Sequence, residues 1–273
     1  MELLDKLNLR LSKSKSQHLL VDEQVLENQL RFANIRRTDR VLEIGAGLGT
    51  LTVALAKQAE KVITVEKDQR FKNYLTETLP DNVELIIDDF LDLELPKFDK
   101  VVANIPYEIS SKIVFKLLNY QFIAGILIFQ LEFANRMAAA HGSHDYSRLT
   151  VKIHTKAHCE ILQQVSRRAF YPVPKVDSAI VELVPRTPSY KIENEALFDK
   201  VVDAVFNQRR KMIKNALLNK HKWFKINKDE MKSVVSDLDY GTLRGEKLSP
   251  EQLAELANKL YFELQQVRKD NSI

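Results

Sequence analysis

The chain has 273 residues, of which 45% are hydrophobic and 29% are charged, the ordinary balance of a globular protein with a sizeable core. No uncharged apolar run approaches the ~20 residues of a membrane-spanning helix, which argues against a membrane protein. The formal net charge of +4 suits a polyanionic partner, although a lysine-rich solvated surface explains it equally well.

The cysteine content and the first residues bear on where the protein works. Cys159 is the only cysteine, which excludes an intramolecular disulfide and fits a reducing compartment. The first twenty residues carry a charge every few positions and lack the apolar core of a secretory signal. We therefore expect a cytoplasmic protein without membrane contact.

Strand-like and helix-like segments alternate over the first half of the chain. Strands are expected at 41–44, in "KVITVEKD" (61–68), in "VELIIDDF" (83–90), and at 100–103 and 124–130. Helices are expected at 22–34, 51–57, 68–79, 109–119 and 131–140. Such alternation predicts a parallel, doubly wound α/β sheet. Two later β-like runs, 149–165 ("LTVKIHTKAHCEILQQV") and 178–185 ("SAIVELVP"), are expected to extend this sheet.

The pattern changes at "VPRTPSY", residues 184–190, which has two prolines and no periodicity and is predicted to be a linker. Beyond it, 195–218 places its apolar residues on one helical face. Ser249 and Gln252 form the signature of a capping box around Pro250, which predicts a second helix start. The sequence thus predicts two domains, a catalytic domain at 1–187 and a small helical domain at 188–273.

A glycine-rich turn lies between the first predicted strand and the following helix. In "EIGAGLG", Gly45, Gly47 and Gly49 let the backbone turn tightly and let a ligand approach closely. The spacing G-x-G-x-G differs from the dinucleotide fingerprint and is shared by methyltransferases that use S-adenosylmethionine, whose cofactor has no pyrophosphate. A tight turn without a ligand remains the alternative.

Acidic residues mark the ends of three consecutive strands. Glu43 precedes the glycine turn, Glu66 ends the second strand, and Asp89 follows the third. A carboxylate at Glu66 can accept hydrogen bonds from ribose hydroxyls, and one at Asp89 can accept from an adenine amino group. Each acid alone is typical of a solvated strand end. Together they indicate one crevice at the carboxyl edge of the sheet.

The fourth strand ends in Asn104-Ile105-Pro106-Tyr107, and here the sequence resembles the ribosomal RNA adenine N6-dimethyltransferase family. Nearly the whole chain is similar, including "SQHLLVDEQVL", "VLEIGAGLGTLT", "DYSRLTV" and "AFYPVPKVDSAIVEL". "FNQRRKMIKNAL" and "LRGEKLSPEQLAELA" resemble the helical domain of the KsgA branch, and favour it over the more distant Erm methyltransferases. His18 and Ser147 stand where the family often has Asn and Gly.

The resemblance implies a Rossmann-like methyltransferase sheet that uses S-adenosylmethionine, releases S-adenosylhomocysteine and needs no metal. The H-x3-H spacing at 154–158 is not interpreted as a metal site, because the chain has a single cysteine and the segment has a β-like pattern. The positions implied to bind the cofactor are His18, Leu20, Glu43, Gly45, Gly47, Glu66, Lys67, Asp89 and Asn104.

The positions implied in catalysis are Asn104, Ile105, Pro106, Tyr107 and Phe170. The Asn104 side chain and a backbone carbonyl of Ile105-Pro106 can accept hydrogen bonds from adenine N6, which favours a more tetrahedral, more nucleophilic nitrogen. Pro106 stiffens the turn. Tyr107 and Phe170 are expected to hold the flipped base between their rings, with core packing as the alternative for each.

Clusters of basic residues are the expected contacts to RNA phosphates, although such runs are often solvated helix faces. They lie in the N-terminal arm, before Phe170, and on the predicted first helix of the small domain: Lys13, Lys15, Arg167, Arg168, Arg209, Arg210, Lys211 and Lys214.

The predicted function is dimethylation of N6 on two adjacent adenosines near the 3′ end of small-subunit ribosomal RNA, coupled to late subunit biogenesis. The partners are the small ribosomal subunit and its rRNA, and the protein is expected to act as a monomer. Two alternatives stay open. One is a ribosome-assembly or RNA-binding factor whose methylation is dispensable. The other is an adenine N6-methyltransferase acting on another nucleic acid.

Overall fold

The computed structural model describes residues 18–270. Backbone contacts divide the chain into two units, the first formed by residues up to 135 with 157–185, the second by 136–156 with the residues from 186 onward. The predicted domain boundary at 187 lies two residues after Pro185, where the chain leaves the first unit for the last time. Residues 136–156 belong to the second unit, whereas the sequence analysis placed them in the first predicted domain. The two-domain assignment remains a proposal about independent folding.

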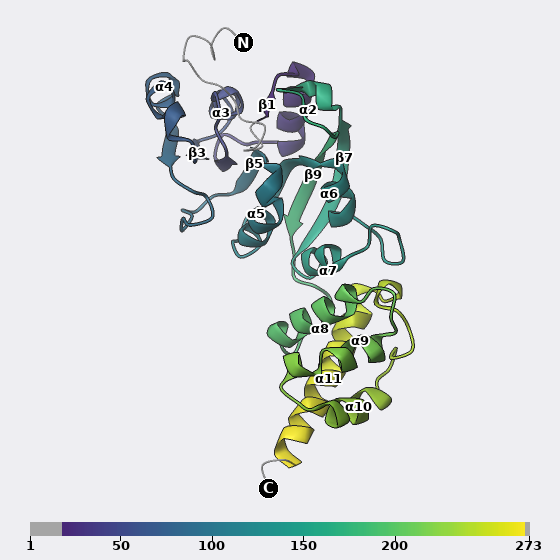
Figure 1. Ribbon diagram of the computed structural model, residues 1–273. Coiled ribbons are helices and arrows are strands. Elements are labelled where there is room, and N and C mark those ends of the chain that lie inside the picture. Colours follow the sequence, from purple (N-terminus) through teal and green to yellow (C-terminus); the bar gives the residue numbers. More distant parts are fainter. Residues whose placement is uncertain (1–17, 271–273) are drawn as a thin grey trace. The chain divides into compact units, whose positions relative to one another are not determined.

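The first unit is built on a mixed sheet with the strand order β4-β3-β2-β5-β6-β9-β7 (Figure 1). Strands β2 to β6 are parallel, β9 runs antiparallel to β6, and β7 runs antiparallel to β9. Their bounds are β2 Arg40–Ile44, β3 Lys61–Glu66, β4 Val83–Ile87, β5 Lys100–Asn104, β6 Ala124–Gln130, β7 Ala157–Val165 and β9 Ser178–Pro185. The predicted Rossmann-like architecture is confirmed, with β9 as an antiparallel insertion into the parallel order.

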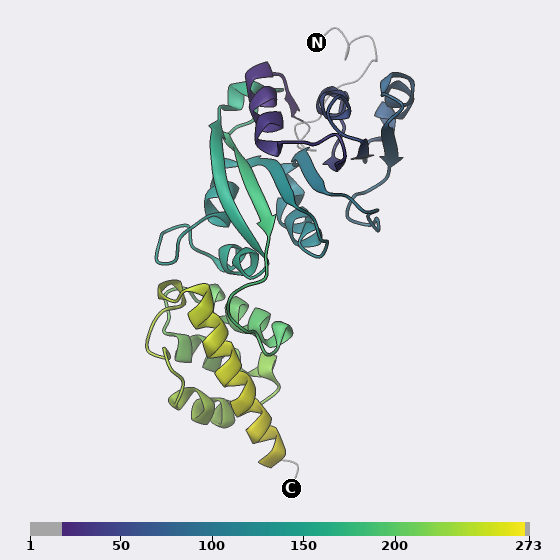
Figure 2. The ribbon, with the colours of Figure 1, turned by 180° about the vertical axis from the view of Figure 1, so that it is seen from behind.

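Helices cover both faces of this sheet. α2 (Glu23–Ala33) and α3 (Thr50–Ala56) bury apolar side chains against one face, where Val41, Val62, Val102 and Ile126 point. α5 (Ser110–Leu117) lies on the opposite face (Figures 1 and 2). α4 (Lys72–Thr78) contacts β4, and α6 (Leu131–Met137) follows β6 directly. Because strand residues alternate between faces, β strands buried on both sides are nearly continuous runs of apolar residues.

Two buried polar side chains fix α2 to the sheet. Gln29 donates from Nε2 to the carbonyls of Ala103 and Ile126, each at 3.3 Å. Lys100 Nζ lies 3.0 Å from Asp39 Oδ2 and also donates to the last carbonyls of α2. A buried charge is tolerated only when it is paired and hydrogen-bonded in this way. These bonds therefore fix β5, and with it the position of Asn104.

One expectation about secondary structure is wrong. The run 149–165 is a strand only from Ala157, because Arg148–His154 forms helix α7. Thr150 Oγ1 accepts from the Ser147 N–H at 3.1 Å and caps the helix start. Val151 is buried in the core of the second unit, a tertiary contact that overrides the β propensity of the segment.

The second unit, residues 136–156 and 186–270 of the described chain, is helical: besides α7 it contains α8 (Glu195–Asn207), α9 (Ile213–Asn219), α10 (Lys228–Ser236) and α11 (Pro250–Asp270). The predicted helix through 195–218 is interrupted, because Gln208 leaves helical geometry at φ −124° and ψ 46°. The capping box at the start of α11 is confirmed: Gln252 N–H donates to Ser249 Oγ at 3.2 Å, and Ser249 N–H to Gln252 Oε1 at 2.9 Å. Within residues 18–270, no helix is long and apolar enough to cross a membrane.

Candidate active site

A pocket opens in the first unit, beside the turn that joins β2 to α3. It is bounded by that turn, by the short strand β1 (Leu19–Leu20) and by the end of β5. The predicted site residues that line it are His18, Leu20, Glu43, Gly45, Gly47 and Asn104. Segments far apart in the sequence therefore meet at the carboxyl ends of β2 and β5, as the sheet topology requires.

The glycine turn uses the conformations that were expected of it. Gly45, Gly47 and Gly49 have φ values of 85°, 56° and 78°, in the left-handed region that favours glycine. A Cβ on Gly47 would lie 2.9 Å from Leu19 Cδ2, whereas a Cβ on Gly45 would meet nothing within 4 Å. The turn therefore packs against Leu19 of β1 at Gly47, whereas the space beside Gly45 is empty of protein atoms.

Glu43 is buried near the end of β2, and among the described residues only one of its carboxylate oxygens is hydrogen-bonded. Oε2 accepts from Thr52 Oγ1 at 2.5 Å and from Thr64 Oγ1 at 2.7 Å. Oε1 is buried and has no hydrogen-bond donor among the described residues. Burial raises the pKa of this carboxyl to about 7, and the two threonine hydroxyls only partly offset that effect.

Glu66, at the end of β3, holds the glycine turn in place. Its Oε2 accepts from the Gly47 N–H at 2.9 Å, and its Oε1 accepts from the Asp68 N–H at 2.8 Å. Burial raises the pKa of Glu66, and these backbone donors oppose the shift. A carboxylate has about four acceptor positions, so Glu66 can support the turn and still accept from ligand hydroxyls.

Asp89, which follows β4, forms an ion pair with Lys67. Lys67 Nζ lies 2.5 Å from Asp89 Oδ2, and the Leu91 N–H donates to Asp89 Oδ1 at 3.0 Å. The Lys67 ammonium is the main reason that the pKa of Asp89 is lowered. Neither residue lines the pocket described above, so their predicted cofactor contacts stay predictions.

The segment Asn104-Ile105-Pro106-Tyr107 is held rigidly. The Ile105 N–H donates to the Ile128 carbonyl at 3.1 Å, and Tyr107 Oη lies 2.8 Å from Ser178 Oγ. The Pro106 carbonyl accepts from the Ile109 N–H at 3.3 Å and from Ser110 Oγ at 3.4 Å. Asn104 Oδ1, in contrast, is buried without a hydrogen-bond donor among the described residues.

Two buried acceptors that have no donor among the described residues, Glu43 Oε1 and Asn104 Oδ1, therefore belong to residues that line one pocket. Leaving a buried acceptor unpaired costs about 1–3 kcal/mol, more for a charged group. These two acceptors fit a ligand that supplies N–H groups, such as an ammonium or an exocyclic amine. S-adenosylmethionine and adenine each carry such groups, so the residues present suit both.

The sequence profile described as "Ribosomal RNA adenine dimethylase" matches residues 8–244. The "Probable ribosomal RNA small subunit methyltransferase A" of Methanosarcina acetivorans is 45% identical over 263 residues, which cover 95% of this chain and 97% of that protein. The chain belongs to the ribosomal RNA adenine dimethylase family. Membership confirms the prediction of an rRNA adenine methyltransferase of the S-adenosylmethionine-dependent class.

Two solved structures of this kind can be compared with the chain. A dimethyladenosine transferase from Plasmodium falciparum has a TM-score of 0.76 and 34% identity, and covers 91% of this chain and 98% of its own. The 23S rRNA methyltransferase ErmE has a TM-score of 0.66 and 30% identity, covering 89% and 99%. The dimethyladenosine transferase is therefore more similar in structure to this chain than ErmE is, as the helical segments of the sequence predicted.

The two predicted aromatic residues have different surroundings. Tyr107 is partly buried, and its ring stacks on His18 with centroids 5.7 Å apart and planes 26° apart. Phe170 is 3% exposed and packs in the apolar cluster beneath α2 and α3. Tyr107 thus lies next to the pocket, because it stacks on His18, which lines it. Phe170 has no free ring face, so the clamp formed by both rings stays a prediction.

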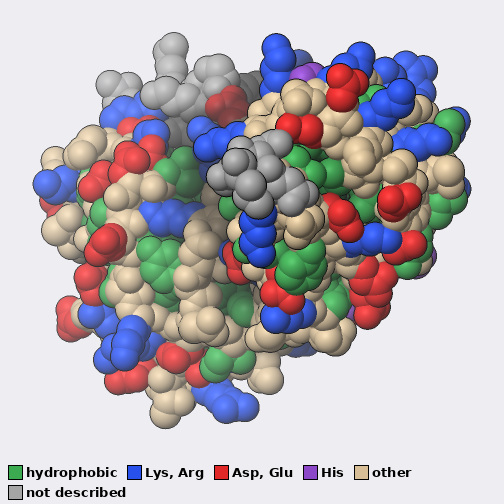
Figure 3. Space-filling model, turned by 90° about the horizontal axis from the view of Figure 1, so that it is seen from below, with side chains coloured by type: hydrophobic (Ala, Val, Ile, Leu, Met, Phe, Trp, Pro, Cys, Tyr) green, Lys and Arg blue, Asp and Glu red, His purple; other side chains and the backbone are tan. Residues whose placement is uncertain are grey.

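The predicted RNA contacts fall into three groups. Lys13 and Lys15 lie outside the described residues. Arg167 and Arg168 are exposed in the turn before Phe170. On the face drawn in Figure 3, Lys and Arg side chains are interspersed with Asp and Glu, so basic character is not confined to one patch there.

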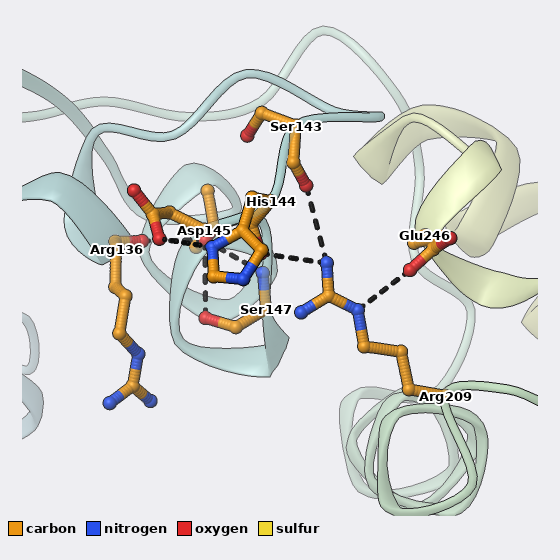
Figure 4. A network of polar contacts seen from close by, with 8 residues as sticks. Arg136, Ser143, His144, Asp145, Ser147, Arg209 and Glu246 are labelled. Carbon is orange, nitrogen blue, oxygen red and sulfur yellow. Dashed lines mark hydrogen bonds and ion pairs between the residues drawn. The ribbon is translucent and has the colours of Figure 1, made fainter.

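The third group needs a correction, because Arg209, Arg210 and Lys211 lie in the turn after α8 and only Lys214 is helical, in α9. Arg210 and Lys211 are exposed and available to a phosphate. Arg209 is used within the second unit: it binds Glu246 and the carbonyls of Ser143 and His144 (Figure 4).

Several site residues were not found from the sequence. Thr64 and Thr52 bind Glu43 from a neighbouring strand and from α3, and Gln29 binds β5 from α2. No local pattern marks such partners, since each is defined by a contact across elements. Ser178 could have been found, because it stands in the Pro-rich segment that already indicated the family. Within residues 18–270, no group of three or more His, Cys, Asp or Glu side chains could hold a metal ion.

Proposed function

We propose that this chain transfers methyl groups from S-adenosylmethionine to N6 of two adjacent adenosines near the 3′ end of small-subunit ribosomal RNA, late in subunit assembly. The buried Oδ1 of Asn104, which has no donor within residues 18–270, carries the proposal, because it lies at a strand end beside the glycine turn. The name of the Methanosarcina acetivorans relative, a probable ribosomal RNA small subunit methyltransferase, supports the choice of substrate.

Several residues described above would hold the cofactor, which when bound supplies an activated methyl group on a sulfonium. The open backbone at Gly45 lets a ligand lie close to the turn. Glu43 Oε1 is a buried acceptor suited to an ammonium, and Glu66 and Asp89 are suited to ribose hydroxyls and an adenine amino group. Lys67 orients the Asp89 carboxylate through its ion pair.

Asn104 is assigned to the adenine that is methylated. Its Oδ1 accepts one N6–H, which withdraws the nitrogen lone pair from the ring and stabilises the positive charge that develops during attack. The Pro106 carbonyl already accepts two internal hydrogen bonds, so the second acceptor is assigned to the carbonyl of Ile105. No strong general base is needed, because the N6 proton becomes acidic once the nitrogen is alkylated.

Tyr107 is assigned to stacking on the same base. Its hydroxyl is tied to Ser178, which fixes the plane of the ring. His18 covers the ring at 5.7 Å, so the base either stacks on the free side or displaces His18. Phe170 would join the clamp only after its ring leaves the apolar cluster.

The decisive experiment uses labelled S-adenosylmethionine and small subunits that lack the modification. Digestion of the RNA should release labelled dimethyladenosine, and Asn104→Ala should reduce transfer by roughly 100-fold or more while the fold survives. Unlabelled RNA, or monomethyladenosine alone, would contradict the proposal. Large subunits and DNA serve as controls, since labelling of either instead would favour the alternative of another nucleic-acid substrate.

The alternative of an assembly factor with dispensable methylation predicts a separate result. Asn104→Ala would then restore subunit assembly in cells that lack the wild-type protein, even though it transfers no methyl groups. A cytoplasmic location and action as a monomer are parts of the proposal that cell fractionation and light scattering would test.

A further inference from the structure

Two adjacent aromatic residues, Phe170 and Tyr171, form the short strand β8, which pairs with β1. The register places Leu20 opposite Phe170 and Leu19 opposite Tyr171. Residues directly opposite each other in an antiparallel pair share one face. Leu20 and Phe170 pack in the apolar cluster, and Leu20 also borders the pocket. Leu19, on the other face of β1, points toward the glycine turn, where its Cδ2 would lie 2.9 Å from a Cβ on Gly47. Tyr171, 38% exposed, therefore lies on the same face of the strand pair as Leu19.

The surroundings of Tyr171 combine exposed apolar and basic side chains. Val173, two residues after Tyr171, is exposed. Val21 is exposed as well, and its N–H donates to the Ala169 carbonyl at 2.8 Å, across the strand pair. Arg168 and Lys175 are exposed on the two sides of β8, and Arg167 Nη1 donates to the Lys175 carbonyl at 3.1 Å, which joins the two segments. The carboxylate of Asp177, the acid in this segment, accepts from the Arg167 N–H at 2.9 Å.

His18 connects this surface with the assigned adenine site. Its Nδ1 lies 2.6 Å from the Pro172 carbonyl, next to Tyr171, and its ring stacks on Tyr107. A nucleotide chain that places one base against Tyr107 thus passes directly beside the segment that carries Tyr171.

We propose that Tyr171 is a stacking platform for the nucleotide next to the target adenosine, with Arg168 and Lys175 as contacts to its phosphates. This inference rests on the proposed function, in which two adjacent adenosines are modified and only one can occupy the site at a time. The other base, once unstacked from its neighbour, gains a planar apolar surface at Tyr171. The flanking cations favour RNA as the occupant over a protein segment.

The test uses a single-stranded RNA that contains the target adenosine with 2-aminopurine as its neighbour, a base whose fluorescence falls when it stacks. Wild-type protein and Tyr171→Phe should quench the probe equally. Tyr171→Ala should lose most of the quenching and bind the RNA roughly 5- to 100-fold more weakly. Affinity for S-adenosylhomocysteine should stay unchanged in all three proteins.

Phe115→Ala is the matched control, because Phe115 is 36% exposed on α5 of the same unit and does not line the pocket. It should quench like the wild type. Arg168→Ala and Lys175→Ala should each weaken binding and reduce its salt dependence without changing the depth of quenching at saturation.

Equal quenching by wild type and Tyr171→Ala would overturn the proposal. So would a variant that quenches normally but binds intact small subunits more weakly, because Tyr171 would then contact a ribosomal protein. Failure of the proposed function would look different: the wild type would form no dimethyladenosine in small subunits, whatever the outcome of the quenching series.

Discussion

Arg209 and Glu246 form a close ion pair, with Arg209 Nε 2.7 Å from Glu246 Oε2. The same guanidinium donates through Nη2 to the carbonyls of Ser143 and His144 at 3.2 and 2.8 Å (Figure 4). The Arg209 guanidinium is the main reason that the pKa of Glu246 is lowered. Arg209 thus joins the loop before α7 to the turn before α11 within the second unit.

This geometry predicts different effects for two neighbouring arginines. Arg209→Ala should lower the free energy of unfolding by about 1–3 kcal/mol, because a carboxylate and two carbonyls lose a charged donor. Arg210→Ala, which removes an exposed side chain, should leave thermal unfolding unchanged and weaken binding to small subunits. Thermal melts and binding titrations of both variants provide the measurement. The expectation fails if Arg209→Ala melts like the wild type.

Glu43→Gln should stabilise the ligand-free protein at neutral and alkaline pH. The folded-state pKa of about 7 lies above the ordinary glutamate pKa of 4.5, so the folded state binds the proton more tightly than the unfolded state. The stability that this proton provides is fully present below about pH 4.5 and is lost as the pH rises through about 7. Gln has no proton to lose, so its advantage should grow across this window and reach about 3 kcal/mol.

Denaturant unfolding between pH 5 and pH 8 would measure that advantage. Glu77→Gln, on the exposed surface of α4, is the matched control and should show no such trend. A difference between Glu43→Gln and the wild type that does not increase with pH would contradict the expectation.

The hydroxyl and the ring of Tyr107 should have different roles, which two substitutions can distinguish. Tyr107→Phe loses the hydrogen bond to Ser178 and should cost about 1 kcal/mol of stability, while it keeps most of the methyl transfer. Tyr107→Ala loses the ring and should reduce transfer by roughly 10- to 100-fold through a weaker hold on the base. Ser178→Ala should resemble Tyr107→Phe. Single-turnover rates of methyl transfer measure both effects. Equal rates for Tyr107→Phe and Tyr107→Ala would contradict the role assigned to the ring.

Glu66 and Asp89 should differ in what their loss does to the fold. Glu66→Ala leaves the Gly47 and Asp68 N–H groups without an acceptor, so both stability and affinity for S-adenosylhomocysteine should fall. Asp89→Ala breaks an exposed pair with Lys67, so affinity should fall roughly 10-fold with little change in melting temperature. Calorimetric titration and thermal melts of the same samples give both quantities. Unchanged affinity in Asp89→Ala would exclude its predicted contact.

The sequence alone was sufficient for the elements whose signals are local. The glycines of the β2–α3 turn need a left-handed backbone, the strand-end acids follow from alternation of strands and helices, and Ser249 caps α11 through a bond three residues away. Such features depend on neighbours within a few positions, so the order of residues determines them. The resemblance carried by Asn104 to Tyr107 added the family, which the comparisons confirmed.

Only the tertiary structure decided the rest, because each of these features depends on a residue distant in sequence. Val151 draws α7 into the core of the second unit, against the β pattern of its segment. Arg209 binds Glu246 and the His144 carbonyl, which are both distant in sequence, so its charge is already paired within the second unit. The pairing of β1 with β8 decides that Phe170 is buried and that Tyr171 lies on the opposite, exposed face, since a shift of one residue would exchange the two faces.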